Sequence, residues 1–427
     1  MYKLKFVVFL MFSVIHLASA SPIVKTKTPT QKRGHSSPSL MPLQPLSERP
    51  VAFHGKHGKS PVFYIPSTVG TIKWGYLPNA DDQPLITVSS GATLIFDTLS
   101  HEGLLEDQGR DPVRFFGRHG VPEKMILKDA IGIAASSIAH DFKKDGPHII
   151  TGPVAIEGAK PGDVLKVDII SVVPRVPYGV ISNRHGKGAL PDEFPETDKP
   201  APDASTEQPE KYHNVSVFTP IQKNAQGQWQ GLLPTKTGGS VRFPTAPFMG
   251  IMGVAVPTSE LVNSVPPSVY GGNLDVNVLG AGATIYLPVF VKGGNFYTGD
   301  PHMAQGDGEV ALTALEHSMR ATFKITLLKK GDARIPSASG FLEKPFGETP
   351  SHWITIGLSP DLDDAMKDAV RESIRFLTEV KGMDRAVAYA YLSAATDYQV
   401  SQVVDKTKGV HAMIRKSDFS RLRRAKK

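Results

Sequence analysis

The densest group of chemically reactive side chains lies within residues 271–310. The segment holds acids, an imidazole and an amide among many glycines: Asp275, Asp300, His302, Gln305, Asp307 and Glu309. Asp300 and His302 are two residues apart, as are Asp307 and Glu309, so on an extended chain the members of each pair face one side. Imidazole and carboxylate without thiolate suit zinc or another divalent ion in a hydrolytic site.

Spacing alone leaves two interpretations of this segment open. In the first, a catalytic zinc keeps an open coordination position and lowers the pKa of its bound water to about 7, so that the water attacks an amide carbonyl without a covalent nucleophile. In the second, Asp and Gly occupy a polar turn for backbone reasons, and His302 is a hydrogen-bonded structural residue. The segment does not have the spacing of an EF-hand calcium loop.

Three other stretches carry weaker signals. Asp97 and His101 lie in IFDTLSHEG at the end of a predicted strand, where ligands are common, and they suit a turn cap equally well. His148 and Glu157 flank ITGPVAIEG; Glu157 precedes a Gly- and Pro-containing turn and also suits a surface acid. The apolar run PFMGIMGVAVP (247–257) predicts core packing with close backbone approach.

Composition limits what these residues can belong to. The chain has 427 residues, 40% of them hydrophobic, which supports a large packed core. It has no cysteine, which excludes disulfides, thiolate metal sites and a nitrilase-type amidase. The net charge of +7 arises at the ends, because residues 21–60 and 415–427 each hold seven basic and one acidic residue. These ends predict solvated basic tails rather than a nucleic-acid surface.

The first twenty residues have the pattern of a signal peptide. Two lysines precede an apolar run over 6–17, and Ala18-Ser19-Ala20 fits the small-x-small cleavage site. No later stretch reaches the apolar length of a membrane span. We therefore expect an exported protein, periplasmic or secreted, without an integral membrane span; an uncleaved N-terminal anchor is the alternative.

The pattern of the remaining chain predicts a β-rich body followed by an α+β portion. Short β-branched segments bounded by Gly, Pro and Asp predict strands, among them 71–76, 85–88, 93–98, 164–173, 283–291 and 322–328. Residues 174–215 form a long polar excursion, which is either disordered or functional. A helical period predicts a helix over 362–380, and Asp384 is the predicted cap of a second helix over 386–394.

These patterns divide the chain into four parts. The predicted parts are a signal peptide (1–20), a flexible basic arm (21–60), a catalytic region (61–414) and a basic tail (415–427). The catalytic region is β-rich to about residue 330 and α+β after it.

Several blocks of sequence, in the same order, resemble the acetamidase/formamidase family. They include TGPVAIEGAKPGDVLKVDI (151–169), PYGVISNRHGKGALPDEFP (177–195), GGNLD (271–275), YLPVFVKGGNFYTGDPHMAQGDGEV (286–310) and SQVVDKTKGVHAMIRK (401–416). With shorter blocks they cover about residues 60–420. GGNLD followed by GDPHMAQGDGEV is long and unusual in composition, so the resemblance favours the metal site over the polar turn.

The resemblance implies a fold and an activity. The implied fold is mainly β with α+β additions: a β-sandwich-like core, a smaller β-barrel part and C-terminal helices. The implied activity is hydrolysis of short aliphatic amides, such as formamide and acetamide, to the carboxylic acid and ammonia. A divalent metal is implied, zinc first and calcium as the alternative, together with self-association into a homo-oligomer.

The resemblance also suggests roles for residues of this chain. The predicted metal ligands are His302, Asp97 and Asp275. Glu157 or Glu309 is the predicted general base toward the metal-bound water, and would return the proton to the departing amine. The predicted substrate contacts are Gly272, Asn273, Gln305 and Asp307.

Two other functions stay open at this point. Pro301 and Met303 flank His302 where the family would have small residues, which leaves room for a non-catalytic relative that binds a small molecule. The excursion at 174–215 would admit a larger substrate, which leaves room for hydrolysis of another C–N bond, in a lactam or a larger amide. The expected partner in each case is a small molecule and not a nucleic acid.

Overall fold

The structure is a computed structural model that describes residues 40–53 and 61–421. The predicted signal peptide (1–20) lies outside the described residues, as do most of the predicted arm and residues 422–427 of the predicted tail. The described part is mainly strand with few helices, which confirms the predicted fold class. Short β-branched segments between glycine and proline turns form most of these strands.

The first large sheet has ten strands within the described residues. Their order is β1 (Val51–Phe53), β2 (Val62–Ile65), β6 (Thr93–Asp97), β19 (Met319–Leu328), β8 (Val164–Pro174), β16 (Thr284–Pro288), β20 (Phe346–Glu348), β21 (His352–Ser359), β23 (Lys408–Arg415) and β22 (Asp397–Gln402). Only β2 and β6 pair in parallel; the other neighbours are antiparallel. The register of β19 on β6 places Arg320 opposite Asp97.

The second large sheet has eleven strands in the described part of the chain. Its main path is β12 (Ser240–Pro244), β11 (Trp229–Pro234), β10 (Val215–Lys223), β9 (Tyr178–Asn183), β18 (Leu315–Glu316), β17 (Phe296–Ala304), β13 (Phe248–Val254) and β15 (Gly271–Asn273). β7 (Ile149–Ile156) also pairs with β17. β3 (Ile72–Trp74) and β5 (Ile86–Val88) in turn pair with β7. Every residue of β13 is buried, which confirms the core packing predicted for this run. A separate pair is formed by β4 (Tyr76–Leu77) and β14 (Val262–Asn263).

The two large sheets pack over a shared hydrophobic core. Phe296 of β17 lies with its ring centroid 5.8 Å from that of Phe96 on β6 and 5.4 Å from that of Phe323 on β19. All three rings are fully buried. Side chains of both sheets thus interdigitate as in a sandwich, as predicted.

The predicted β-barrel part is not found among residues 40–53 and 61–421. Both large sheets are open: one ends at β1 and β22, the other at β12 and β15. Closure would need the outermost strands to pair with each other. Instead β12 is mostly exposed and forms the outer edge of a hairpin with β11.

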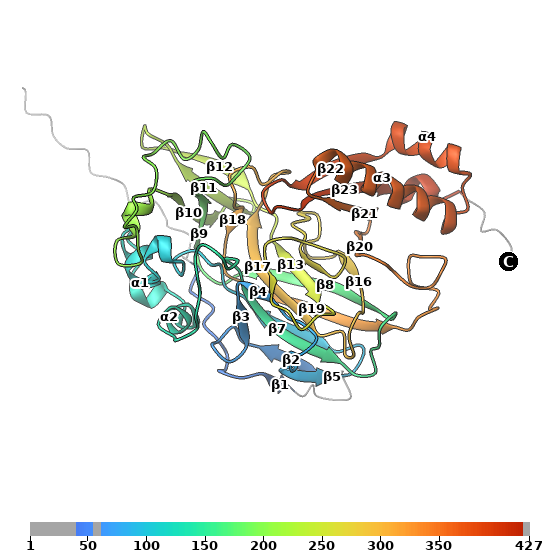
Figure 1. Cartoon of the computed structure of the whole chain (residues 1–427), viewed down its shortest axis with the longest axis horizontal. Coiled ribbons are helices and arrows are strands. Elements are labelled where there is room, and N and C mark those ends of the chain that lie inside the picture. Colours follow the sequence, from blue (N-terminus) through green and yellow to red (C-terminus); the bar gives the residue numbers. More distant parts are fainter. Residues whose placement is uncertain (1–39, 54–60, 422–427) are drawn as a thin grey trace, which may run out of the picture. The chain divides into compact units, whose positions relative to one another are not determined.

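The two C-terminal helices occur as predicted. They are α3 (Leu362–Glu379) and α4 (Arg385–Ala395), and Asp384 accepts hydrogen bonds from the N–H groups of Ala386 and Val387. Figure 1 shows both helices beside β21–β23, in the red part of the chain. Two short helices, α1 (Pro112–Gly117) and α2 (Lys128–Ala134), were not predicted. None of the helices in the described part is both long and apolar enough to cross a membrane.

Residues 40–53, within the predicted arm, lie against the body. The buried Arg175 side chain donates through Nε to the carbonyl oxygen of Leu43 (2.9 Å), and Arg320 donates to that of Gln44 (3.0 Å). β1 then pairs with β2. Guanidinium groups offer donors only, so buried ones require acceptors such as these carbonyls.

Candidate active site and metal centre

A cavity of about 510 Å³ brings together residues from distant parts of the sequence. The acidic and imidazole side chains on its wall include His101, His148, Asp300, Glu309, Glu316 and Asp405. His101 follows β6, His148 directly precedes β7, Asp300 lies on β17 and Glu316 on β18. The excursion at 174–215 contributes Arg184 and residues 186–188 and 191 to the wall.

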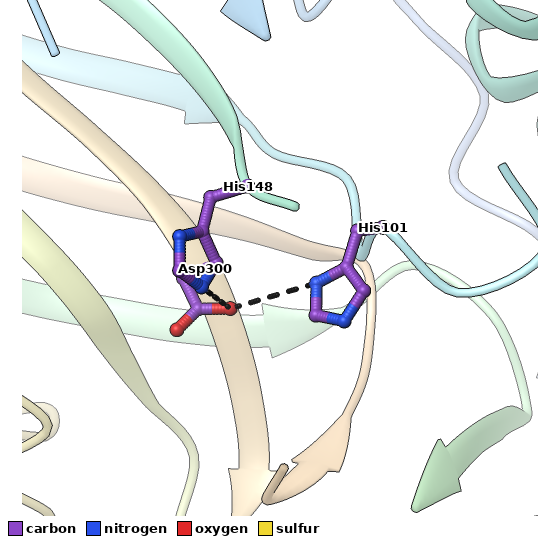
Figure 2. A group of neighbouring side chains, drawn as sticks. All are labelled: His101, His148 and Asp300. Carbon is purple, nitrogen blue, oxygen red and sulfur yellow. Dashed lines mark ion pairs between the residues drawn. The ribbon is translucent and has the colours of Figure 1, made fainter. Parts of the chain in front are cut away.

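Three buried side chains at this wall point toward one another (Figure 2). Oδ1 of Asp300 lies 4.0 Å from Nδ1 of His101 and 3.8 Å from Nε2 of His148. One candidate ligand atom from each residue lies within 4.8 Å of the other two. These separations exceed the 2.7–3.2 Å of a hydrogen bond and suit ligand atoms placed around one ion.

The second nitrogen of His148 has a hydrogen-bond partner, because its Nδ1 lies 2.9 Å from Oγ of Ser264. A partner of this kind fixes the orientation and tautomer of a metal-ligating histidine and leaves Nε2 for a cation. Nε2 of His101 lies 3.2 Å from Oε1 of Glu102 but makes no hydrogen bond within the described residues. Arg184 lies 3.2 Å from the same Glu102 oxygen.

Buried carboxylate oxygens support the same conclusion. In the described residues, both side-chain oxygens of Asp275, Oδ1 of Asp300, Oε2 of Glu316 and Oδ2 of Asp405 have no hydrogen-bond partner. Burial raises the pKa of Glu316 to about 7 and that of Asp405 to about 8. A bound cation would neutralise these crowded carboxylates, and a set of imidazoles and carboxylates without sulfur fits zinc or a similar divalent ion.

His302 is fully buried on β17, behind Asp300. Its Nε2 lies 3.0 Å from Oδ2 of Asp300 and 3.1 Å from Oε1 of Glu316. Its Nδ1 lies 2.9 Å from Oε1 of Gln305, and Gln305 donates through Nε2 to two carbonyls, so Oε1 must accept from His302. Nδ1 therefore donates, whereas Nε2 makes no hydrogen bond within the described residues. Burial alone would lower the pKa of His302, but Asp300 and Glu316 outweigh it and hold that pKa well above its usual range.

Two further groups have ligand spacing, and His302 belongs to both: Asp275, His302 and Glu309, and Asp300, His302 and Glu316. The ligand role of His302 therefore stays a prediction. Nε2 of His302 lies beside Asp300 and Glu316, and the predicted pairing of Asp300 with His302 on one side of an extended strand is confirmed.

Three residues of the site have an uncommon backbone conformation. Asp275, Asp300 and Glu309 have φ angles of 50°, 50° and 49°. Residues other than glycine rarely adopt positive φ, and such strained positions cluster at functional sites. Asp275 and Glu309 thus belong to the cluster, in agreement with their prediction as site residues.

Three predicted site residues lie elsewhere. The carboxylate of Asp97 is buried but lies 2.6 Å from Nε of Arg320 and 2.6 Å from the hydroxyl of Tyr64, so its charge is already compensated. Glu157 is exposed in the turn after β7 and accepts a hydrogen bond from Ser89. Asp307 is also exposed, because the chain turns there and does not continue as a strand. Their placement away from the cavity wall does not support Asp97 as ligand, Glu157 as base or Asp307 as substrate contact.

The other predicted substrate contacts differ in whether they lie on the cavity wall. Asn273 lies on the cavity wall, and its Oδ1 has no hydrogen-bond partner among the described residues. Gly272 packs near Leu77 and Tyr297, away from the wall. Gln305 positions His302. Glu316 and Asp405 were not singled out from the sequence; for Asp405, its place within the block 401–416 was the available signal.

Comparisons with known proteins give the family. The formamidase of Methylophilus methylotrophus is 30% identical over 221 residues, covering 43% of this chain and 52% of that protein. The acetamidase of Mycolicibacterium smegmatis is 28% identical over 254 residues, covering 50% and 62%. This chain thus spans between half and two thirds of the length of these curated relatives.

Fold and family agree. The crystal structure of an acetamidase from Bacillus halodurans superposes with a TM-score of 0.62, covering 84% of this chain and 99% of that chain, at 24% identity, which shows a shared fold. The acetamidase/formamidase family model matches residues 133–265 and 257–414, which is more than half of the sequence. This chain therefore belongs to the acetamidase/formamidase family.

Proposed function

We propose that this protein is a metal-dependent amidohydrolase that converts short aliphatic amides to a carboxylate and ammonia. The observation that carries the proposal is the group of His101, His148 and Asp300 at the cavity wall, in which Ser264 holds the second nitrogen of His148. The names of the related formamidase and acetamidase support the substrate class.

We assign a role in this reaction to each residue of the site. His101 Nδ1, His148 Nε2 and Asp300 Oδ1 would hold the cation, with Oε2 of Glu316, 3.9 Å from His101 Nδ1, as a further oxygen. A divalent cation in such a set polarises an amide carbonyl and acidifies water. Nε2 of His302 lies 3.0 Å from Oδ2 of Asp300 and 3.1 Å from Oε1 of Glu316, and so would hold both carboxylates in place before substrate arrives.

Glu309 is our proposed general base. It is buried on the cavity wall, and burial together with the neighbouring Asp405 raises its pKa although His302 opposes the shift. A carboxylate with a raised pKa accepts a proton from water readily and can return it to the departing amine. Zinc is the first candidate for the ion and calcium the alternative.

Ammonia release from formamide and acetamide tests the proposal. We expect turnover by the full-length protein, loss of turnover after chelation, and recovery when zinc is added back. His101→Ala and His148→Ala should each bind less metal, as measured by elemental analysis of the purified protein. Their turnover should fall by roughly 100-fold or more. Glu309→Gln should lose turnover by roughly 100-fold or more while keeping its metal.

Matched controls separate the site from general damage. His352→Ala, at the start of β21, and Glu157→Gln, in the exposed turn after β7, should keep both metal and turnover. Full activity after exhaustive metal removal, confirmed by elemental analysis, would refute the metal-dependent mechanism. Absence of turnover with every amide and every metal would refute the amidohydrolase.

We also propose export and self-association. Export rests on the signal-peptide pattern of residues 1–20, and self-association on the family resemblance. N-terminal sequencing of the purified protein should give Ser21 or a near neighbour, and sedimentation should give a mass above that of the 46.2 kDa chain. An intact Met1, or a monomer at micromolar concentration, would contradict the respective proposal.

A further inference from the structure

The cavity is larger than formamide or acetamide requires. Cavities of about 300–1,000 Å³ hold drug-sized ligands, and this one has about 510 Å³. His101, His148 and Asp300 account for one part of its wall. Residues 186–188 and 191 of the excursion, with residues 403, 404 and 406, form another part, which the proposed reaction on a small neutral amide does not use.

That other part of the wall holds a lysine without an ion pair. Nζ of Lys187 lies 6.0 Å from the centroid of the Phe142 ring, and neither an ion pair nor a hydrogen bond of this ammonium is found among residues 40–53 and 61–421. Lys406, on the same wall, is likewise unpaired within the described chain. Arg184 nearby differs, because Glu102 and Asp107 compensate its charge.

Lys187 and Lys406 are both exposed, and both line the cavity. The carboxylate of Asp405, next to Lys406 in the chain, lies on the same wall. An ammonium that lines a cavity without an ion pair is stabilised by an anion that enters the cavity.

From this arrangement we infer that Lys187 and Lys406 form a subsite for a carboxylate on the substrate, so that the preferred substrates are amides with an anionic group at the far end, such as the monoamides of dicarboxylic acids. The inference rests on the proposed amidohydrolase function. The carboxylates of the wall, Asp300, Glu309, Glu316 and Asp405, would repel the anionic end and so favour the orientation with that end at the two ammonium groups and the amide toward the two histidines.

Steady-state kinetics with a graded panel tests the inference. The panel is acetamide, butyramide, oxamate, malonamate, succinamate and glutaramate, with the zinc-loaded full-length protein. We expect at least one anionic amide to exceed butyramide in kcat/KM. In Lys187→Met the ratio of anionic to neutral kcat/KM should fall by roughly 10-fold to 100-fold, the range for a hydrogen bond to a charged group. Lys160→Met, an exposed lysine in the turn after β7, is the matched control and should keep the wild-type ratio.

Two kinetic results would overturn the inference while leaving the amidohydrolase intact. One is a panel in which neutral amides are preferred and Lys187→Met leaves the ratio unchanged. The other is an equal loss for neutral and anionic amides, which would place Lys187 in the reaction itself. If Lys187→Met relieves inhibition by acetate without changing the ratio, the lysine binds the product carboxylate, and the substrate inference also fails.

A binding measurement separates failure of the inference from failure of the proposed function. Titration calorimetry with succinate, which has no amide to hydrolyse, should show binding that weakens in Lys187→Met and at high salt. Succinate binding of this kind without turnover of any amide would refute the amidohydrolase and keep the anion subsite. Turnover of acetamide without succinate binding would refute the anion subsite and keep the amidohydrolase.

Discussion

The hydroxyl of Ser264 carries no charge, yet it fixes one of the two histidines that face Asp300. It lies 2.9 Å from Nδ1 of His148 and is buried. Without it, the imidazole could rotate and either nitrogen could take the proton, so fewer molecules would present Nε2 to a cation. The site therefore depends on residues that would never touch the metal or substrate.

We expect Ser264→Ala to weaken zinc binding by about 10-fold, the lower end of the effect of removing such a partner. Competition with a chromophoric chelator measures the affinity directly. Ser89→Ala is the control, because its hydroxyl contacts only the exposed Glu157 carboxylate. Equal affinities in wild type and Ser264→Ala would show that the hydroxyl does not orient His148.

Residue types were more predictable than residue partners. The sequence indicated His302, Asp275 and Glu309 because they cluster along the chain, and all three lie in the buried group. The sequence also suggested Asp97 as a metal ligand. In the structure the negative charge of that carboxylate is compensated by Arg320, which lies 223 residues away in the chain. The positively charged side chain that faces a given carboxylate is set by strand register. A local sequence pattern does not contain this information.

At the scale of elements, the approach of α3 to β21 depends on a glycine with ordinary backbone angles. A Cβ at Gly357 would lie 2.1 Å from the carbonyl oxygen of Ala365 and 2.2 Å from the amide nitrogen of Ala369. Both are backbone atoms of α3 and cannot turn aside as a side chain would. The helix therefore packs closely only where β21 has no side chain.

We expect Gly357→Ala to lower the free energy of unfolding by about 1–3 kcal/mol, the usual range for overpacking. Urea unfolding followed by circular dichroism gives the value. Gly132→Ala in α2 is the matched control, since a Cβ there meets nothing within 4 Å, and it should be neutral or stabilising by up to about 1 kcal/mol. Wild-type stability in Gly357→Ala would mean that α3 does not lie this close to β21.

Element prediction failed where the elements are short. The helical period needs two or more turns to stand out, which α3 and α4 provide. α1 and α2 have six and seven residues, too few for the pattern to repeat. The strands β6 and β8 were predicted to within about one residue, because turn residues bound them on both sides.

At the scale of the whole molecule, composition and turn spacing were enough to predict a β-rich body with a C-terminal α+β portion, and the family resemblance added the sandwich-like core. The order of strands within each sheet was not predictable, since neighbours such as β6 and β19 are separated by more than 200 residues. The open edges that replace the expected barrel follow from that order. The cavity too exists only after the sheets have formed, because its wall combines residues of β14, β15, β17 and β18 with residues of several loops.

The contact between Arg320 and Gln44 has a consequence for how the chain is made. The two residues are 276 positions apart, and the neighbouring Leu43 depends on Arg175, 132 positions later. At a synthesis rate of about 5–20 residues per second, Gln44 waits roughly 15–55 s for its partner to be translated. During that time β6 has no β19 to pair with, and the backbone groups at that edge remain open to other chains. Yield of folded protein should therefore be limited by how well this early segment is kept from aggregating while the rest of the chain is synthesised.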